Sequence, residues 1–279
     1  MSTNSLSFLK TWRGNREAHA RYLQWVTVGK PSYLRLYCCD LTFLPSEICQ
    51  LVNLRYLILD SNRLTPLPLK ICQLTSLLEL SLVGNQLTSL PPEIGQLVNL
   101  QRLSLAINHL TSLPPEIGQL VNLQKLYLRN NQLISLPSEI GQLVNLQHLY
   151  LRENQLTILP PEIGQLINLK DLRLNNNRLT SLPSEIGQLV NLQVLDLYNN
   201  QLTSVLPEIG QLVNLQTLLL KNNLLTTLPL EFGRLVNLQL LSIEQNPLND
   251  FPLFSSITDL RRICREALAR RVKATKTKR

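Results

Sequence analysis

The sequence predicts an α/β solenoid, in which a short strand and a short helical turn repeat along the chain. Three observations predict this fold class. A motif returns every 23 residues from Leu54 onward, apolar and polar residues alternate within it, and Gly and Pro recur at fixed places instead of clustering in linkers. Such a period is typical of stacked repeats, in which each unit contacts its neighbours, and ordinary globular domains lack it.

The repeating motif reads LxxLxLxxNxLxxLPxEIGxLxN. Further copies start at Leu77, Leu100, Leu123, Leu146, Leu169, Leu192, Leu215 and Leu238. A divergent copy begins at Pro31 and the last copy breaks down after Phe251, so we expect nine full repeats and one partial repeat.

The first half of each copy predicts a strand. In the copy that starts at Leu123, alternation places Leu126 on the buried face and Lys125 and Tyr127 on the opposite face. We expect the strands to stack in parallel, about 4.8 Å apart, into a curved sheet on the concave side. The motif's Asn, such as Asn131, recurs as a ladder whose amides satisfy the buried backbone of the turn.

The second half of each copy predicts one short helical turn on the convex side. In residues 113–122, Pro suits the first turn, and Glu116 lies where the helix dipole favours a negative charge. Ile117 and Leu120 are expected to point into the core, and Gly118 is expected to permit a sharp exit from the turn.

Both ends of an open stack need a cap. We expect residues 1–30 to form an N-terminal helical cap, with a helix from Asn15 to about Val28. Residues 31–254 are the predicted solenoid. Residues 255–279 are the predicted C-terminal capping helix and basic tail.

The C-terminal segment also carries the net charge. Residues 261–279 hold nine Lys and Arg and one Glu, whereas residues 1–260 hold eighteen charges of each sign. Ser256 is a predicted helix cap, and residues 272–279 are expected to form a disordered tail. A charge run of this kind is usually a solvated end, but it also suits contact with nucleic acid or an anionic membrane.

The repeat, with stretches such as LTSLPPEIGQLVNLQ, resembles leucine-rich repeats of the LPxEIGxLxNL type. Such repeats occur in intracellular Ras-pathway scaffolds, Scribble-type polarity proteins and bacterial proteins that include effectors acting inside host cells. The resemblance implies a signalling scaffold or a host-directed effector that binds a protein. A small GTPase or phosphatase complex would be the partner by analogy with the Ras-pathway relatives, and a host protein by analogy with the effectors.

The outward strand positions vary from copy to copy, although core packing does not demand that variety, so specificity is expected there. Aromatic and basic residues, types that are common in binding hot spots, gather over the middle strands. We expect the partner-binding residues to be Lys125, Tyr127, Arg129, His148, Tyr150, Arg152, Arg173 and Tyr198. The alternative is a solvated sheet in which Tyr127 stacks on Tyr150, and Arg152 pairs with Glu153 or Asp171.

The sequence offers no catalytic or metal-binding pattern. Its three histidines, His19, His109 and His148, fall at unrelated places, and Gly-rich phosphate loops are absent. We therefore expect neither an enzyme nor a cofactor. The opening residues lack a signal-peptide stretch and the five cysteines lack metal-ligand spacing, so we expect a cytoplasmic monomer with reduced thiols. Delivery into a host cell would follow if the protein is a bacterial effector.

Overall fold

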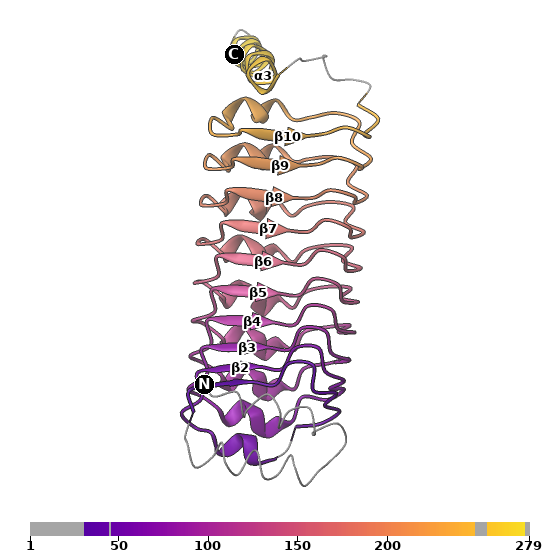
Figure 1. Ribbon diagram of the computed structural model, residues 1–279. Coiled ribbons are helices and arrows are strands. Elements are labelled where there is room, and N and C mark those ends of the chain that lie inside the picture. The colour runs from indigo at the N-terminus through magenta and orange to yellow at the C-terminus, as the bar shows by residue number, and fades with distance from the viewer. Residues whose placement is uncertain (1–30, 45, 249–255, 277–279) are drawn as a thin grey trace. The chain divides into compact units, whose positions relative to one another are not determined.

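A computed structural model describes residues 31–44, 46–248 and 256–276. The predicted N-terminal cap lies outside the described residues. Ten strands and nine 3₁₀ turns alternate along the described chain, followed by helix α3, Ile257–Lys276 (Figure 1). The chain divides into two compact units, residues 1–132 and 133–279.

All strands are three residues long, and each 3₁₀ turn has five residues. The strands are β1 (Tyr33–Arg35), β2 (Tyr56–Ile58), β3 (Glu79–Ser81), β4 (Arg102–Ser104), β5 (Lys125–Tyr127), β6 (His148–Tyr150), β7 (Asp171–Arg173), β8 (Val194–Asp196), β9 (Thr217–Leu219) and β10 (Leu240–Ser242). The turns are η1 (Ser46–Gln50), η2 (Leu69–Gln73), η3 (Pro92–Gln96), η4 (Pro115–Gln119), η5 (Ser138–Gln142), η6 (Pro161–Gln165), η7 (Ser184–Gln188), η8 (Pro207–Gln211) and η9 (Leu230–Arg234).

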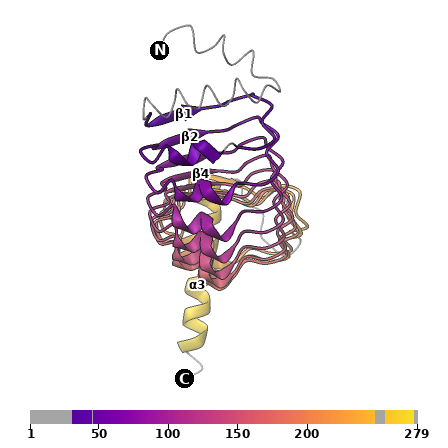
Figure 2. The same ribbon diagram turned by 90° about the horizontal axis from the view of Figure 1, so that it is seen from below.

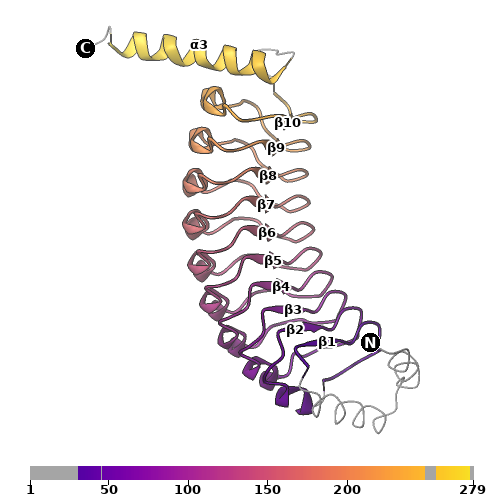
Figure 3. The same cartoon turned by 60° about the vertical axis from the view of Figure 1, so that its left-hand side comes forward.

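Within each unit the strands pair in parallel and in chain order, with equivalent residues of successive copies opposite one another. In the first unit Arg102 pairs with Lys125, and in the second Arg173 pairs with Asp196. The register shifts by 23 residues at each step because the copies have equal length. In the second unit, β6–β10 line one side and the turns line the other (Figure 3). The expected solenoid of strands and short helical turns is confirmed.

Leucines at the inward positions build the core. The middle residue of each strand from β2 to β9, such as Leu126 or Leu149, is fully buried, and so are most of the leucines and isoleucines of the turns. The 3₁₀ turns of the first unit lie one behind another when that unit is seen from its end (Figure 2). Burial of this repeated apolar surface is the main stabilising term of the fold.

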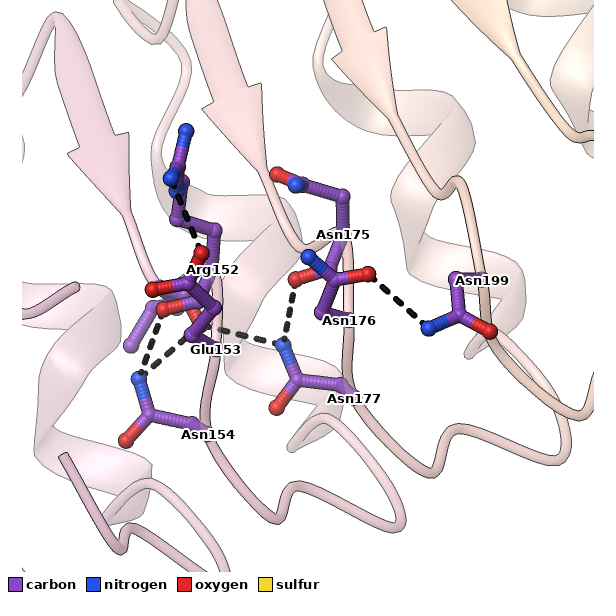
Figure 4. A network of polar contacts seen from close by, with 8 residues as sticks. Arg152, Glu153, Asn154, Asn175, Asn176, Asn177 and Asn199 are labelled. Atoms are coloured by element: carbon purple, nitrogen blue, oxygen red, sulfur yellow. Dashed lines mark hydrogen bonds and ion pairs between the residues drawn. The ribbon is translucent and has the colours of Figure 1, made fainter. Parts of the chain in front are cut away.

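The Asn ladder forms as the sequence predicts. Asn177 donates its amide to the carbonyls of Leu151 and Leu174, at 3.0 and 2.9 Å, and its Oδ1 accepts the N–H of Leu156 at 3.0 Å. Within each unit, amides of this row therefore join successive copies. In Figure 4, Asn177 bonds to the backbone between the ends of neighbouring strands.

A second, exposed row of asparagines joins the copies near the 3₁₀ turns. Asn191 donates to the carbonyl of Ile167 at 2.8 Å, and Asn214 donates to that of Val190 at 2.8 Å. The motif contains this Asn as its last letter, but the sequence did not reveal its role, because an exposed amide has no obvious partner until the copies are stacked.

The glycine of the 3₁₀ turn serves a purpose that differs from the one predicted. Gly118 was expected to permit a sharp exit, yet among the described glycines only Gly84 has a positive φ, of 66°. The glycine instead leaves room for the next copy. A Cβ atom on Gly187 would lie 2.7 Å from the carbonyl oxygen of Glu208, closer than packing allows.

Helix α3 begins after Ser256, whose Oγ accepts the N–H of Asp259 at 3.1 Å. Leu260 and Cys264 are buried, and the helix packs on η9, across the end of the second unit (Figure 3). The disorder expected from residue 272 onward is wrong for residues 272–276, which continue the helix. This segment contains no proline and no glycine, so nothing in it breaks helical hydrogen bonding.

Candidate partner-binding surface

The candidate surface is the strand face, defined as the outward side chains of the strands together with the residue two positions after each strand. Alternation places these side chains on the side of the sheet opposite the leucine core. The predicted site residues all occupy this face. Lys125, Tyr127 and Arg129 belong to the first unit and the other five to the second, and each group is described by itself.

In the first unit, Lys125 and Tyr127 stand on β5, next to β4. The guanidinium of Arg102 lies 6.0 Å from the centre of the Tyr127 ring, within the range of a cation–π contact. Lys125 and Arg102 also line a hollow of about 160 Å³ together with Tyr56 and Glu79. Arg102 was not among the predicted site residues, although its pairing with Lys125 follows from the repeat register.

In the second unit, four strand-face residues form a connected group. Tyr150 donates its hydroxyl to Oδ2 of Asp171 at 2.8 Å. The Arg173 guanidinium lies 4.9 Å from the Tyr150 ring centre and donates from Nε to Oδ1 of Asp171 at 3.1 Å. His148 meets the same tyrosine edge-on, with ring centres 6.2 Å apart. We call Tyr150, Asp171 and Arg173 the Tyr150 triad.

Arg152 and Tyr198 have contacts outside the triad. Arg152 pairs with the neighbouring Glu153 at 2.8 Å, as the alternative hypothesis allowed, and Figure 4 shows this pair beside Asn175. Tyr198 is 37% exposed, and its backbone N–H donates to Oδ1 of Asp196 at 3.1 Å. The structure therefore joins Tyr150 and Arg173 through Asp171 and places His148 against the Tyr150 ring, and it leaves Arg152 and Tyr198 outside this group.

Two acidic residues that the sequence analysis did not assign to the site set its electrostatics. The hydrogen bond to Asp171 raises the pKa of Arg173 above its ordinary value and keeps the guanidinium charged. Burial raises the pKa of Asp196, and the Tyr198 N–H and Arg173 only partly oppose this effect. Asp196 lies opposite Arg173 in the repeat register, and Asp171 precedes Arg173 by two residues on the same strand, so sequence spacing could have identified both.

A second aromatic group, also missed, lies on the strand face of the first unit. The rings of Tyr33 and Tyr56, on adjacent strands, have centres 6.2 Å apart, and the Arg35 guanidinium lies 5.2 Å from the centre of the Tyr37 ring. All three tyrosines are exposed. Their recurrence at outward positions of consecutive copies was visible in the sequence.

Metal ligands and thiol reactivity can be assessed among the described residues. Among the described residues, no group of three His, Cys, Asp or Glu is placed to hold a metal ion. Burial raises the pKa of the Cys39, Cys72 and Cys264 thiols to about 11, 12 and 11. These cysteines therefore stay protonated near neutral pH, unlike activated nucleophiles. No helix within the described ranges is both long and apolar enough to cross a membrane.

The chain matches a family model described as a leucine-rich repeat region over residues 93–169 and 160–243, and a single Leucine Rich Repeat over residues 76–97. A repeated strand and 3₁₀ turn around a leucine core, with an Asn ladder, defines the same class of protein. The chain belongs to the leucine-rich-repeat family, whose members are commonly protein-binding scaffolds and generally not catalysts.

Solved structures agree with this assignment. A leucine-rich-repeat protein of Leptospira interrogans is 45% identical with a TM-score of 0.78, and the match covers 86% of this chain and 61% of that one. The ectodomain of the plant receptor kinase GASSHO1/SCHENGEN3 of Arabidopsis thaliana, in complex with CASPARIAN STRIP INTEGRITY FACTOR 2, is 37% identical with a TM-score of 0.66. That match covers 73% of this chain and 26% of the receptor. A search of curated protein sequences found no match.

Proposed function

We propose that this protein is a protein–protein interaction scaffold that binds its partner through the strand face. The residues that carry binding are Lys125, Tyr127 and Arg129 in the first unit, and His148, Tyr150, Arg152, Arg173 and Tyr198 in the second. The observation that carries the proposal is the Tyr150 triad. Core packing does not require it, yet its hydrogen bonds hold a tyrosine and an arginine in fixed positions on an outward face.

Preorganised Tyr and Arg side chains suit recognition because they lose little conformational entropy on binding and offer large contact areas. The plant receptor kinase ectodomain supplies an analogy, since it is described in complex with CASPARIAN STRIP INTEGRITY FACTOR 2. The strand face is therefore proposed to bind a protein or peptide, without catalysing a reaction on it.

A finer proposal concerns where the scaffold acts. All five cysteines are free, which suits a reducing compartment such as the cytoplasm. The likeness to a bacterial leucine-rich-repeat protein supports a role in a bacterium, either in signalling in its own cytoplasm or as an effector inside a host cell. The corresponding partners would be a signalling protein, such as a small GTPase or a phosphatase complex, or a host protein.

The test is affinity capture with the full chain and the double variant Tyr127→Ala/Tyr150→Ala. The double variant is expected to lose the captured partner while keeping its thermal unfolding midpoint within a few degrees. Ile158→Ala is a matched control, because Ile158 is exposed but lies outside the strand face. If the double variant recovers every partner as well as the control does, the proposed surface is wrong.

The alternative function is binding of nucleic acid or an anionic membrane through the basic C-terminal segment. Two arginines of this segment bond to the solenoid, which leaves fewer basic side chains for contact with a polyanion. Arg265 donates from Nε to the Gly233 carbonyl at 3.0 Å, and Arg261 donates to the Leu238 carbonyl. These two arginines therefore help to dock α3, and the rest of the segment supplies the charge for a polyanion.

Added salt and truncation of the C-terminus distinguish binding through the strand face from binding through the basic segment. Deleting residues 271–279 keeps Leu260, Cys264, Arg261 and Arg265 in place, so the docked part of α3 remains. Binding that survives this deletion and moderate salt supports the strand face. Binding to DNA or to anionic vesicles that disappears under either treatment supports the basic segment.

A further inference from the structure

Four side chains form one row across the first unit, at the first position of each strand from β2 to β5, which lie side by side (Figure 1). In the parallel register Glu79 lies opposite Tyr56 on one side and Arg102 on the other. Arg102 in turn lies opposite Lys125. The row therefore places two cations on adjacent strands, about 4.8 Å apart. Like charges directly opposite one another destabilise a sheet, so an anion bound beside them would be stabilising.

One carboxylate compensates these two cations, and it does so weakly. Arg102 Nη1 lies 3.7 Å from Oε1 of Glu79, which is an ion-pair distance but too long for a hydrogen bond. Among the described residues, the Arg102 guanidinium donates no hydrogen bond, and its other contact is the Tyr127 ring at 6.0 Å. The Lys125 ammonium has neither a hydrogen bond nor an ion pair with any described residue. Both cations therefore keep their donors available for an added acceptor.

The row lines the hollow of about 160 Å³ together with Gln101 and Gln124. The backbone N–H groups of these two glutamines already donate within the sheet, at 2.8 Å, to the carbonyls of Leu78 and Gln101. Side chains must therefore supply the donors of the hollow. Pockets for small-molecule ligands usually measure about 300–1,000 Å³. This smaller hollow suits a single side chain rather than a cofactor.

A single carboxylate matches the charge of the hollow. Arg102 and Lys125 against Glu79 leave one net positive charge among its lining residues. The two oxygens of a carboxylate can accept from the planar fork of Arg102 and from the Lys125 ammonium. A phosphate group carries about 1.5–2 negative charges near neutral pH, and Glu79 in the same hollow would repel it more strongly.

We propose that this hollow receives an acidic side chain, glutamate or aspartate, from the protein partner, held by Arg102 and Lys125. The proposal rests on the proposed scaffold function and names the chemistry of the partner at one place on the strand face. Arg102 also contacts Tyr127, one of the residues proposed to carry binding, so the two contacts are continuous. Glu79 competes with the incoming carboxylate for Arg102, and this competition gives the proposal a distinctive test.

The test is an NMR titration of the full-length protein with acetyl-Gly-Glu-Gly-amide, and with acetyl-Gly-Gln-Gly-amide as the uncharged control. Both ends are blocked, so the glutamate side chain is the sole carboxylate. We expect saturable shifts of the Arg102 and Lys125 backbone amides with the glutamate peptide alone. Lys125→Met should bind this peptide at least about tenfold more weakly, because a charge-assisted hydrogen bond is lost. Glu79→Gln should bind it about threefold more tightly, because the competing ion pair is removed.

Lys70→Met is the matched control. It removes the same charge from an exposed lysine of the same unit, but Lys70 belongs to turn η2, outside the strand face, so this variant should bind as the wild type does. Equal shifts with the glutamine peptide, tighter binding of inorganic phosphate, equal losses in Lys70→Met and Lys125→Met, or weaker binding by Glu79→Gln would each overturn the proposal. The partner capture that depends on Tyr127 and Tyr150 is measured separately, so either idea can fail alone.

Discussion

Tyr150 and Asp171 lie on adjacent strands and are joined by a hydrogen bond of 2.8 Å between the phenol and the carboxylate. Arg173 donates to both oxygens of the same carboxylate, and its guanidinium lies over the Tyr150 ring. The bond thus fixes the orientation of an aromatic side chain on an outward face, where packing alone would leave it free to rotate.

Tyr150→Phe removes that hydroxyl and keeps the ring. We expect a loss of about 0.5–1.5 kcal/mol in the free energy of unfolding, because a partly buried hydrogen bond to a charged group is lost. Urea denaturation followed by circular dichroism measures it. Tyr198→Phe is the control, and no hydrogen bond of the Tyr198 hydroxyl is present in the described structure. A stability equal to that of the control would mean that the bond does not order Tyr150.

Asp196→Asn tests the electrostatics of the strand face. Burial raises the folded-state pKa of Asp196 above its unfolded value, so the folded protein binds the proton more tightly. The free energy of unfolding of the wild type therefore falls as the pH rises from the unfolded-state pKa of Asp196 through its folded-state pKa. We expect the variant to be more stable than wild type at pH 7, and the difference to shrink on acidification. A variant that is less stable at pH 7 contradicts this sign.

The two asparagine rows predict different costs for the same substitution. Asn200→Ala should destabilise by about 1–3 kcal/mol, because it leaves the buried carbonyls of Leu174 and Leu197 and the N–H of Leu179 unpaired. Asn191→Ala removes one exposed bond and should cost less than about 1 kcal/mol. Chemical denaturation of both variants gives the comparison, and equal costs would refute the distinction.

The glycines predict a further pair of outcomes. Gly187→Ala places a methyl group against the backbone of the next turn, so we expect a loss of about 1–3 kcal/mol in the free energy of unfolding. Gly84→Asn should be tolerated, because its φ of 66° is close to the 55° of Asn130 at the same place in another copy, and a Cβ atom there would lie 3.6 Å from Ser61 Oγ, an ordinary van der Waals distance. The thermal unfolding midpoints of the two variants test both expectations. A lower midpoint for Gly187→Ala alone would mean that close stacking requires Gly187, whereas the backbone conformation at Gly84 also accepts Asn.

Most of the fold could be predicted from the sequence because 23-residue copies of equal length can pair only in one register. That register gives the neighbours of every strand-face residue, including Arg102 beside Lys125. The length of α3 and the reason for the turn glycines could not be predicted, since the first depends on where a helix without a stop signal ends, and the second on how closely successive turns approach.

The candidate site was less predictable than the fold. Register alone places Arg173 next to Asp196, yet the guanidinium bonds to Asp171. That choice depends on side-chain rotamers and on the Tyr150 hydroxyl, which no sequence pattern encodes. The grouping of the eight residues as one binding surface therefore stays a prediction, and binding experiments must test it.

The measurement that tests the central claim most directly is capture of partner proteins by the full chain, by Tyr127→Ala/Tyr150→Ala and by the Ile158→Ala control. A scaffold that binds through the strand face should lose its partner only in the double variant, while all three proteins remain folded. Equal recovery of the partner by all three proteins would contradict the account.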